Sequence, residues 1–223
     1  MSRDWVEWHE FYTTPGSSLG RRLEVVRRDL RRALSAAPAS GPGRSGEAHR
    51  AGPGESVDGT LRIVSICAGD GRDVLPVIAE HDRKVSALLV ELDPTLAARA
   101  RETADDLLLS DVDVRMADAG DARTYAGVQP AHILLTCGVF GNVDAADARR
   151  TVAALPALLV PGGIVIWTRA GDASLELRSL FAEHGFTELS FTAPDDAPFR
   201  VGMHRLAGPV RPGPLTGRLF TFR

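Results

Sequence analysis

The stretch "ICAGDGRDVL", from Ile66 to Leu75, joins the end of an apolar run to the expected start of a helix near Arg72. Between them lie Gly69 and Gly71, which let the backbone turn tightly and approach a ligand without an intervening Cβ. In parallel α/β sheets, a loop of this kind at the carboxyl end of a strand receives a nucleotide-like ligand. The loop alone does not distinguish a dinucleotide from a nucleoside triphosphate or a nucleoside without phosphate.

Around this loop, apolar strand-like runs alternate with helix-like segments. The predicted strands span 61–67, 85–92, 112–118, 131–137 and 162–169, and the predicted helices span 72–81, 94–105, 144–159 and 172–184. Near-continuous apolar strands are typical of a parallel sheet buried on both faces, and the alternation is typical of a doubly wound α/β fold. The runs "GFTELSFTA" and "PFRVGMHRL" follow each other without a helix, which predicts a terminal antiparallel hairpin.

The 223 residues, of which 44% are hydrophobic, suit one globular domain with additions at its ends. We predict an N-terminal helical lid over 1–34, a flexible Gly/Pro-rich linker over 35–59, the main domain over 60–207 and a tail over 208–223. The apolar residues of the tail are expected to dock on the domain; they are Leu219, Phe220 and Phe222.

The lid contains one clear amphipathic helix. Its apolar stripe recurs every three or four residues and consists of Leu19, Leu23, Val26, Leu30 and Leu34. Arginines fill the rest of this helix, and we interpret them as a solvated face because acidic residues lie among them. The aromatic-rich residues before the helix are Trp5, Trp8, His9, Phe11 and Tyr12. Two interpretations of them stay open: a helix packed onto the core, or a lid with His9 and Tyr12 facing a ligand.

Charge and cysteine content narrow the classes of partner. A net charge of −3 gives no bulk attraction to nucleic acid or to an anionic membrane, and no apolar run reaches the length of about 20 residues that spans a bilayer. The N-terminus lacks the pattern of a signal peptide, so we expect a cytoplasmic protein. Cys67 and Cys137 lack metal-ligand spacing, so we expect reduced thiols and no metal site.

Acidic residues follow consecutive predicted strands at the edge where ligands bind. Glu91 ends the second strand, 20 residues after Gly71, and Asp118 follows the third. A carboxylate at the first position accepts hydrogen bonds from ribose hydroxyls, and one at the second is able to accept from an adenine amino group. The sequence has no Gly-Lys-Ser/Thr after the glycines, which excludes a P-loop. Val74 replaces the third glycine or alanine of dinucleotide-binding loops, which counts against NAD without excluding it.

With these residues in place, the sequence resembles the class I S-adenosylmethionine-dependent methyltransferases over 61–207. The motifs that carry the resemblance are "IVSICAGDGRDV", "LLVELDP", "MADA", "ILLTCGVFGN" and "LLVPGGIVIWTR". The resemblance implies a three-layer fold with a seven-stranded sheet of order 3-2-1-4-5-7-6, in which strand 7 is antiparallel. The segment "DWVEWHEFY" also looks like a group of uncharacterised actinobacterial members.

The resemblance also implies S-adenosylmethionine as the cofactor and a set of binding residues. They are Cys67, Ala68, Gly69, Gly71, Arg72, Asp73, Glu91, Leu92, Asp118, Ala119, Cys137 and Gly138. The family usually has an acidic residue where Cys67 stands, and that acid helps to hold the cofactor's amino group. Asp73 stands where the family has its third glycine, and we expect it to cap the helix that follows.

Methyl transfer needs alignment of donor and acceptor, and needs a base only if the acceptor must lose a proton. No catalytic residue is certain, but the candidates are His9, Tyr12 and Asn142, and the expected acceptor-binding residues are Tyr12, Phe140, Asn142 and Arg169. The absence of an evident substrate domain favours a small-molecule acceptor over RNA or protein. Two alternatives stay open: an NAD-dependent oxidoreductase, and a non-catalytic regulatory protein that binds S-adenosylmethionine.

Overall fold

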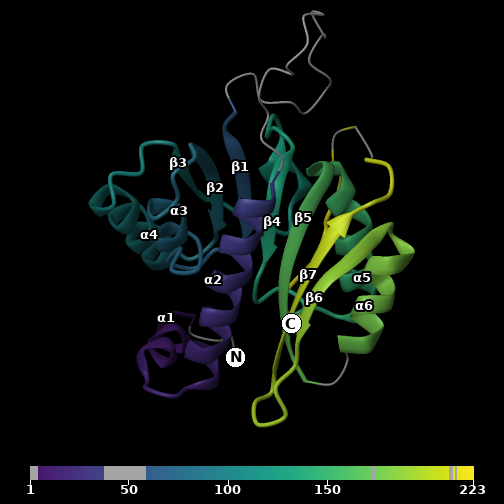
Figure 1. Ribbon diagram of the computed structural model, residues 1–223, viewed down its shortest axis with the longest axis horizontal. Helices are drawn as coiled ribbons and strands as arrows, with labels where there is room; N and C mark the ends of the chain where they lie inside the picture. Colours follow the sequence, from purple (N-terminus) through teal and green to yellow (C-terminus); the bar gives the residue numbers. More distant parts are fainter. Residues whose placement is uncertain (1–4, 38–58, 172–173, 211–212, 214) are drawn as a thin grey trace, which may run out of the picture.

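The computed structural model describes residues 5–37, 59–171, 174–210, 213 and 215–223. Within them, seven strands form one sheet in the order β3-β2-β1-β4-β5-β7-β6, as Figure 1 shows. The strands are β1 (Leu61–Ile66), β2 (Val85–Glu91), β3 (Val112–Met116), β4 (Ala131–Thr136), β5 (Leu159–Ala170), β6 (Phe186–Thr192) and β7 (Phe199–Leu206). The first five pair in parallel, and β7 runs antiparallel to both β5 and β6. The predicted fold class, strand order and terminal hairpin are therefore confirmed.

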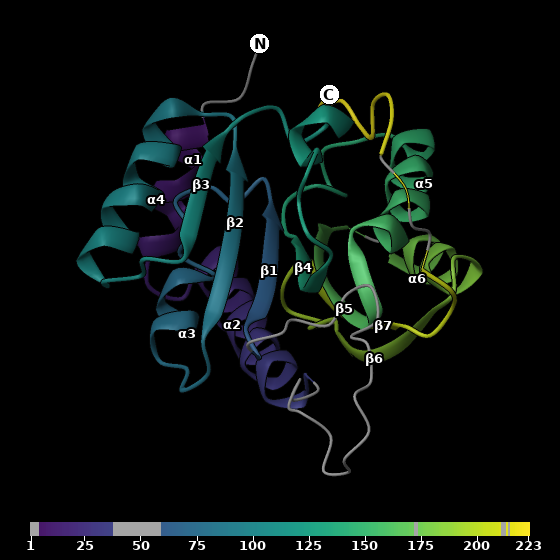
Figure 2. The ribbon, with the colours of Figure 1, turned by 90° about the horizontal axis from the view of Figure 1, so that it is seen from above.

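The helices cover both faces of this sheet. They are α1 (Trp5–Glu10), α2 (Ser18–Ala36), α3 (Leu75–Ala79), α4 (Pro94–Asp106), α5 (Ala145–Ala154) and α6 (Ser174–Glu183), with short 3-10 turns η1 (Phe11–Thr13), η2 (Ala122–Tyr125) and η3 (Leu155–Ala157). Seen from above in Figure 2, α2, α3 and α4 lie on one side of the sheet, and α5 and α6 lie on the other. This is the three-layer arrangement that the alternating sequence pattern predicts.

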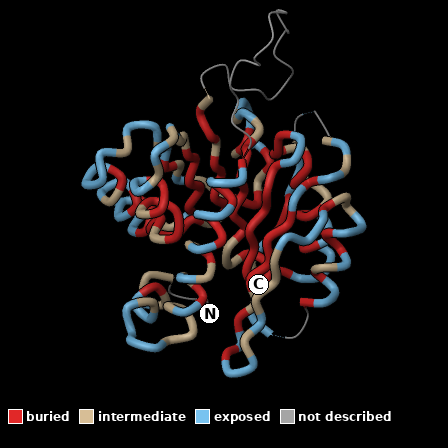
Figure 3. Tube along the Cα trace, viewed as in Figure 1, coloured by how far each residue is buried: buried red, intermediate tan, exposed pale blue. Residues whose placement is uncertain are grey.

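Alternate residues of the buried strands supply two hydrophobic cores. Ile63 of β1 packs in the core beneath α2, α3 and α4, whereas its neighbour Val64 packs beneath α5 and α6. Figure 3 shows the central strands as almost continuously buried. The apolar stripe of α2 joins the first core through Val26, Leu30 and Leu34, and α2 packs against β5 and β7. The cores therefore fix the carboxyl ends of β1, β2 and β4 at one edge.

One predicted helix is much shorter than expected. The helix predicted for 72–81 is α3, which spans only Leu75–Ala79. The carbonyl of Gly71 accepts hydrogen bonds from the amides of both Val74 and Leu75, so a tight turn replaces the expected first helical turn. Pro76 lies at the start of α3 and lacks an amide hydrogen. The expected start of this helix near Arg72 was therefore wrong.

The ends of the chain pack on the domain where they are described. Leu219 and Phe220 are buried in the second core, as expected for a docked tail. Most of the predicted linker, 38–58, lies outside the described residues, while Ser35 and Ala36 belong to α2. None of the helices in the described part of the chain has the length and apolar character that a bilayer span requires.

Candidate functional site

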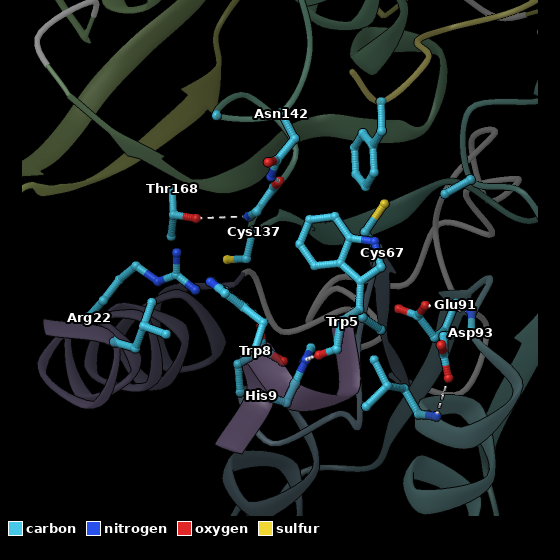
Figure 4. Close-up of a pocket in the computed structure, with 18 of the residues that line it drawn as sticks. Trp5, Trp8, His9, Arg22, Cys67, Glu91, Asp93, Cys137, Asn142 and Thr168 are labelled. Atoms are coloured by element: carbon cyan, nitrogen blue, oxygen red, sulfur yellow. Dashed lines mark hydrogen bonds between the residues drawn. The ribbon is translucent and has the colours of Figure 1, made fainter. Parts of the chain in front are cut away.

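A cavity of about 850 Å³ opens at the carboxyl ends of the parallel strands. Its walls come from α1, α2, the segments that follow β1, β2, β3, β4 and β5, and the C-terminal tail. This is the edge of a doubly wound sheet at which ligands bind, and the volume falls within the range of about 300–1,000 Å³ that is typical of small-molecule sites. Figure 4 shows side chains from these segments converging on the cavity.

Most of the residues expected at the site do line this cavity. They are His9, Tyr12, Cys67, Ala68, Arg72, Asp73, Glu91, Leu92, Asp118, Ala119, Cys137, Gly138, Asn142 and Arg169. The lining residues include two groups of charged and polar side chains, which we name after their carboxylates. We call Cys67, Glu91, Asp118 and Arg218 the Glu91 end, and Tyr12, Arg22, Asp73 and Cys137 the Asp73 end.

The two glycines of the loop shape it without lining the cavity. Gly69 has φ +59°, and the His9 ring lies where a Cβ on Gly69 would be. Gly71 has φ +73° and faces Leu75 and Leu89 of the core. Both positions favour glycine, because L side chains rarely adopt this left-handed backbone. Neither glycine lines the cavity, because the His9 ring lies beside Gly69 and core side chains lie beside Gly71.

Phe140 also lies elsewhere than expected. Its side chain is fully buried and packs edge-on against Phe181 and Trp167, with ring centroids 6.0 and 6.5 Å away. The chain after β4 directs Phe140 into the core beneath α5 and α6. The prediction that Phe140 lines the acceptor pocket was therefore wrong, because an aromatic side chain of this size is more stable in that core.

At the Glu91 end, the carboxylate of Glu91 is held by the backbone. One oxygen accepts a hydrogen bond from the Gly69 amide at 2.7 Å, and the other accepts from the amides of Leu92 and Asp93, both at 2.8 Å. An ionised carboxylate offers about four acceptor positions, so one remains for a ligand. Glu91 therefore ties the glycine loop to the end of β2 and presents a fixed acceptor to the cavity.

Asp118 is fixed by the tail. One oxygen accepts from the Gly120 amide at 2.8 Å, and the other accepts from the Arg218 guanidinium at 2.7 Å. Arg218 also donates to the Thr221 hydroxyl at 2.8 Å, and Phe220 and Phe222 line the cavity beside it. The tail thus forms a wall of the site, whereas the sequence predicted only that it docks.

The Cys67 thiol is close enough to Glu91 and Asp118 for both charges to affect its pKa. Burial raises the pKa of its thiol well above the ordinary value, and the charges of Glu91 and Asp118 raise it further. Cys67 also adopts φ +57°, which is uncommon for a residue with a side chain. An acidic residue here would be a third carboxylate in the same field, so a neutral thiol is the less costly occupant.

At the Asp73 end, Asp73 does not cap a helix. The residue before α3 is Val74, and no side chain caps this helix. Asp73 is 9% exposed, and its Oδ1 is buried without a hydrogen-bond partner among the described residues. Burial raises the pKa of Asp73 to about 6, against a hydrogen bond with its own backbone that lowers it; the charge of Asp70 also raises this pKa, while Arg22 and Arg27 lower it. The predicted capping role was wrong because the turn at Gly71 delays the helix.

Arg22 extends from α2 into the same end of the cavity. It is 9% exposed, it donates to the Tyr12 hydroxyl, and its guanidinium lies 5.3 Å from the centre of the Trp8 ring. In Figure 4 the guanidinium points toward Cys137 and Thr168. We missed Arg22 by assigning every arginine of this helix to solvent. A signal was present: Arg22 follows Leu19 by three residues and precedes Val26 by four, so it shares their face.

The N-terminal aromatic segment both packs on the domain and lines the cavity, so the two interpretations of it are compatible. Trp5, Trp8, His9 and Tyr12 all line the cavity, and they also contact one another. The Trp5 ring lies 5.7 Å from that of Phe222, so the two described ends of the chain meet at the site. The segment therefore packs on the domain and covers the cavity at once.

The three candidate catalytic residues occupy different settings. His9 Nδ1 lies 2.7 Å from the Trp5 carbonyl, which assigns the proton of a neutral imidazole to Nδ1. Burial raises the pKa of Tyr12 to about 12, so this phenol stays protonated at neutral pH. The Asn142 amide donates to the Gly138 carbonyl at 2.6 Å, and the Gly138 amide donates to the Thr168 hydroxyl at 2.9 Å. Tyr12 is therefore suited to hydrogen bonding and not to proton removal.

Arg169 is the next-to-last residue of β5 and lies beside the cavity. It lines the cavity, and its Nε is buried without a hydrogen-bond partner among the described residues. A guanidinium Nε–H that lacks an acceptor among the described residues is suited to a carboxylate or phosphate group of a ligand.

The sheet order and the cavity at its carboxyl edge define the fold of the class I S-adenosylmethionine-dependent methyltransferases, the class that the sequence resembles. A family model described as "Putative methyltransferase" matches residues 55–174, and the chain belongs to this family. No curated protein matches the sequence.

Solved structures agree on the fold. The magnesium protoporphyrin IX methyltransferase of Synechocystis PCC 6803, solved with bound SAM, is 12% identical, with a TM-score of 0.63 and 90% of each chain covered. The N-methyltransferase NodS of Bradyrhizobium japonicum WM9 is 13% identical, with a TM-score of 0.57, 87% of this chain covered and 99% of NodS covered. An O-methyltransferase family protein of Burkholderia thailandensis is 15% identical, with a TM-score of 0.55, 89% of this chain covered and 62% of that chain covered.

Proposed function

We propose that the protein transfers a methyl group from S-adenosylmethionine to a small-molecule acceptor. The observation that carries this proposal is a cavity at the carboxyl edge of the sheet, lined by two buried carboxylates, Glu91 and Asp73, in a chain of a methyltransferase family. When bound, S-adenosylmethionine supplies an electrophilic methyl group on a sulfonium. The residues of the chain then need to orient, enclose and desolvate the reactants.

We assign the nucleoside of the cofactor to the Glu91 end. Glu91 accepts hydrogen bonds from ribose hydroxyls with its remaining acceptor position, and Asp118 faces the adenine beside Ala119. The other proposed contacts are Cys67, Ala68 and Leu92 near the ribose, and Arg72, Asp73, Cys137 and Gly138 toward the amino-acid end. Gly69 and Gly71 act through the shape of the loop, which gives Glu91 its amide partners.

We assign the acceptor to the side of the cavity formed by Asn142 and Arg169, with Trp5 and Trp8 excluding water. A displacement at a sulfonium has a good leaving group, so orientation by hydrogen bonds suffices unless the acceptor must lose a proton. A net charge of −3 and a cavity of small-molecule size favour a small molecule over nucleic acid. Both cysteines are free, which supports placing the reaction in the reducing cytoplasm.

Calorimetry with S-adenosylmethionine, S-adenosylhomocysteine and NADH tests the cofactor. We expect micromolar binding of the two sulfur nucleosides and none of NADH. Binding of NADH alone would assign the protein to the oxidoreductases. Incubation with a panel of small acceptors and detection of S-adenosylhomocysteine then tests turnover, and binding without turnover on any acceptor would favour the regulatory alternative.

A further inference from the structure

The Asp73 carboxylate is a buried charge without a described protein partner for one of its oxygens. Oδ1 of Asp73 is buried and accepts no hydrogen bond within the described chain, although the side chain lines the cavity. An unpaired buried carboxylate is costly, which is why burial raises its pKa. The turn after Gly71 keeps Asp73 out of the helix-capping position. The hydrogen bonds that Asp73 makes, with its own backbone and with the Cys137 thiol, leave Oδ1 without a partner among the described residues.

A buried cation lies at the same end. Arg22 donates to the Tyr12 hydroxyl and packs on two aromatic rings, and no carboxylate of the described residues forms an ion pair with it. Its charge acts on both Asp73 and Cys137, which places all three groups in one neighbourhood. A carboxylate and a guanidinium that both face one end of a cavity are complementary to an ammonium and a carboxylate on one ligand.

We propose that Asp73 and Arg22 together bind the zwitterionic amino-acid group of the ligand, with Asp73 accepting hydrogen bonds from its ammonium and Arg22 donating to its carboxylate. This inference rests on the proposed function, since the same ligand places its nucleoside at Glu91. It also assigns to Asp73 the task that an acidic residue at position 67 would perform. The groups that face Asp73 are Tyr12, Arg22, Arg27, Asp70, Arg72 and Cys137.

The test is a thermodynamic cycle in which the Asp73 carboxylate is removed from the protein and the ammonium group is removed from the ligand, separately and together. Calorimetry compares S-adenosylhomocysteine with its deaminated analogue, 5′-S-(3-carboxypropyl)-5′-thioadenosine, on the wild type and on Asp73→Asn. We expect the wild type to prefer S-adenosylhomocysteine by at least tenfold, and Asp73→Asn to bind the two within about twofold of each other, because a charge-assisted hydrogen bond is lost in either case.

Asp118→Asn serves as the matched control, because it removes a carboxylate at the other end. It should weaken both ligands by the same factor and keep the tenfold preference. Retention of that preference in Asp73→Asn would overturn the inference. So would an equal loss of both ligands, which would place Asp73 in the scaffold of the loop.

The wild type alone distinguishes the zwitterion assignment from the proposed function. If Asp73→Asn does not fold, equal binding of the two ligands by the wild type alone would overturn the assignment, and Asp73→Ser takes the place of the asparagine variant. If the wild type binds neither ligand, the proposed function fails; if it binds both without preference, only the zwitterion assignment fails.

Discussion

The carboxylates of Glu91 and Asp73 lie in one cavity, but the protein treats them in opposite ways. Glu91 receives three backbone amides, whereas Asp73 has an oxygen with no partner in the described chain. The Glu91 end is thus complete as a piece of protein structure, and its acceptor position is fixed before any ligand arrives. The Asp73 end is stable only at a cost, and a ligand cation is able to remove that cost.

The contrast predicts that Glu91 contributes to both stability and ligand binding, whereas Asp73 contributes to ligand binding alone. The hydrogen bonds of Glu91 connect the glycine loop to β2, so its removal should affect stability and binding together. The hydrogen bonds of Asp73, with its own backbone and with the Cys137 thiol, leave one oxygen unpartnered in the described chain, so its replacement should affect binding but relieve the fold.

Glu91→Gln should produce the largest loss. A glutamine directs an NH₂ group at one or more backbone N–H donors, so the variant loses charge-assisted hydrogen bonds worth about 1.5–3 kcal/mol each. We expect the free energy of unfolding in urea to fall by about 2–4 kcal/mol, and S-adenosylhomocysteine to bind at least tenfold more weakly. Glu80→Gln, which alters an exposed ion pair with Arg31, is the control and should change neither quantity appreciably. A fully stable Glu91→Gln protein would contradict the structural role of this carboxylate.

Asp73→Asn should act in the opposite direction on the ligand-free protein. The folded pKa of Asp73 is about 6, above the ordinary value of 3.8, so its stability contribution is fully present below about pH 3.8 and is lost as pH rises through 6. Two pKa units correspond to about 3 kcal/mol. We expect the variant to exceed the wild type in stability by up to that amount at pH 7, with the difference vanishing near pH 4.

Asp196→Asn provides the contrast for this pH profile. Asp196 is exposed, and its hydrogen bonds to Arg21 lower its pKa, so its contribution is present above its ordinary pKa and is lost at lower pH. This variant should be slightly less stable than the wild type at pH 7. Equal pH profiles for the two variants in urea unfolding would refute the account of Asp73 as a costly buried charge.

The fold could be predicted because its signals are local. Apolar runs bounded by Gly, Pro and Asp mark the strands, and Asp93 with Pro94 marks the start of α4, where Asp93 accepts from two amides. The error at α3 came from expecting the helix to begin directly after Gly71, whereas the turn at Gly71 delays the helix to Leu75.

The missed parts of the site depend on contacts between distant segments. Arg218 meets Asp118 across 100 residues, which no local pattern encodes. The role of Arg22 depends on what covers the stripe of α2, and the position of Phe140 depends on the core beneath α5 and α6. Residue type at the strand ends therefore predicted most of the Glu91 end. At the Asp73 end the sequence pointed to Tyr12, Asp73 and Cys137, whereas the place of Arg22 became visible only when α2 was placed over the loop.

Arg218→Ala should give the smallest effect of the three substitutions. The Arg218 and Asp118 side chains are 47% and 40% exposed, so their ion pair contributes less than about 1 kcal/mol to stability. Arg218 nevertheless holds the tail beside the Glu91 end, and we expect S-adenosylhomocysteine and its deaminated analogue to weaken equally, by about twofold to fivefold in calorimetry. Arg149→Ala removes a similarly exposed pair outside the cavity and should leave both affinities unchanged. If Arg218→Ala instead discriminated between the two ligands, the Glu91 end would also read the amino-acid group, and the division of the cavity into two ends would fail.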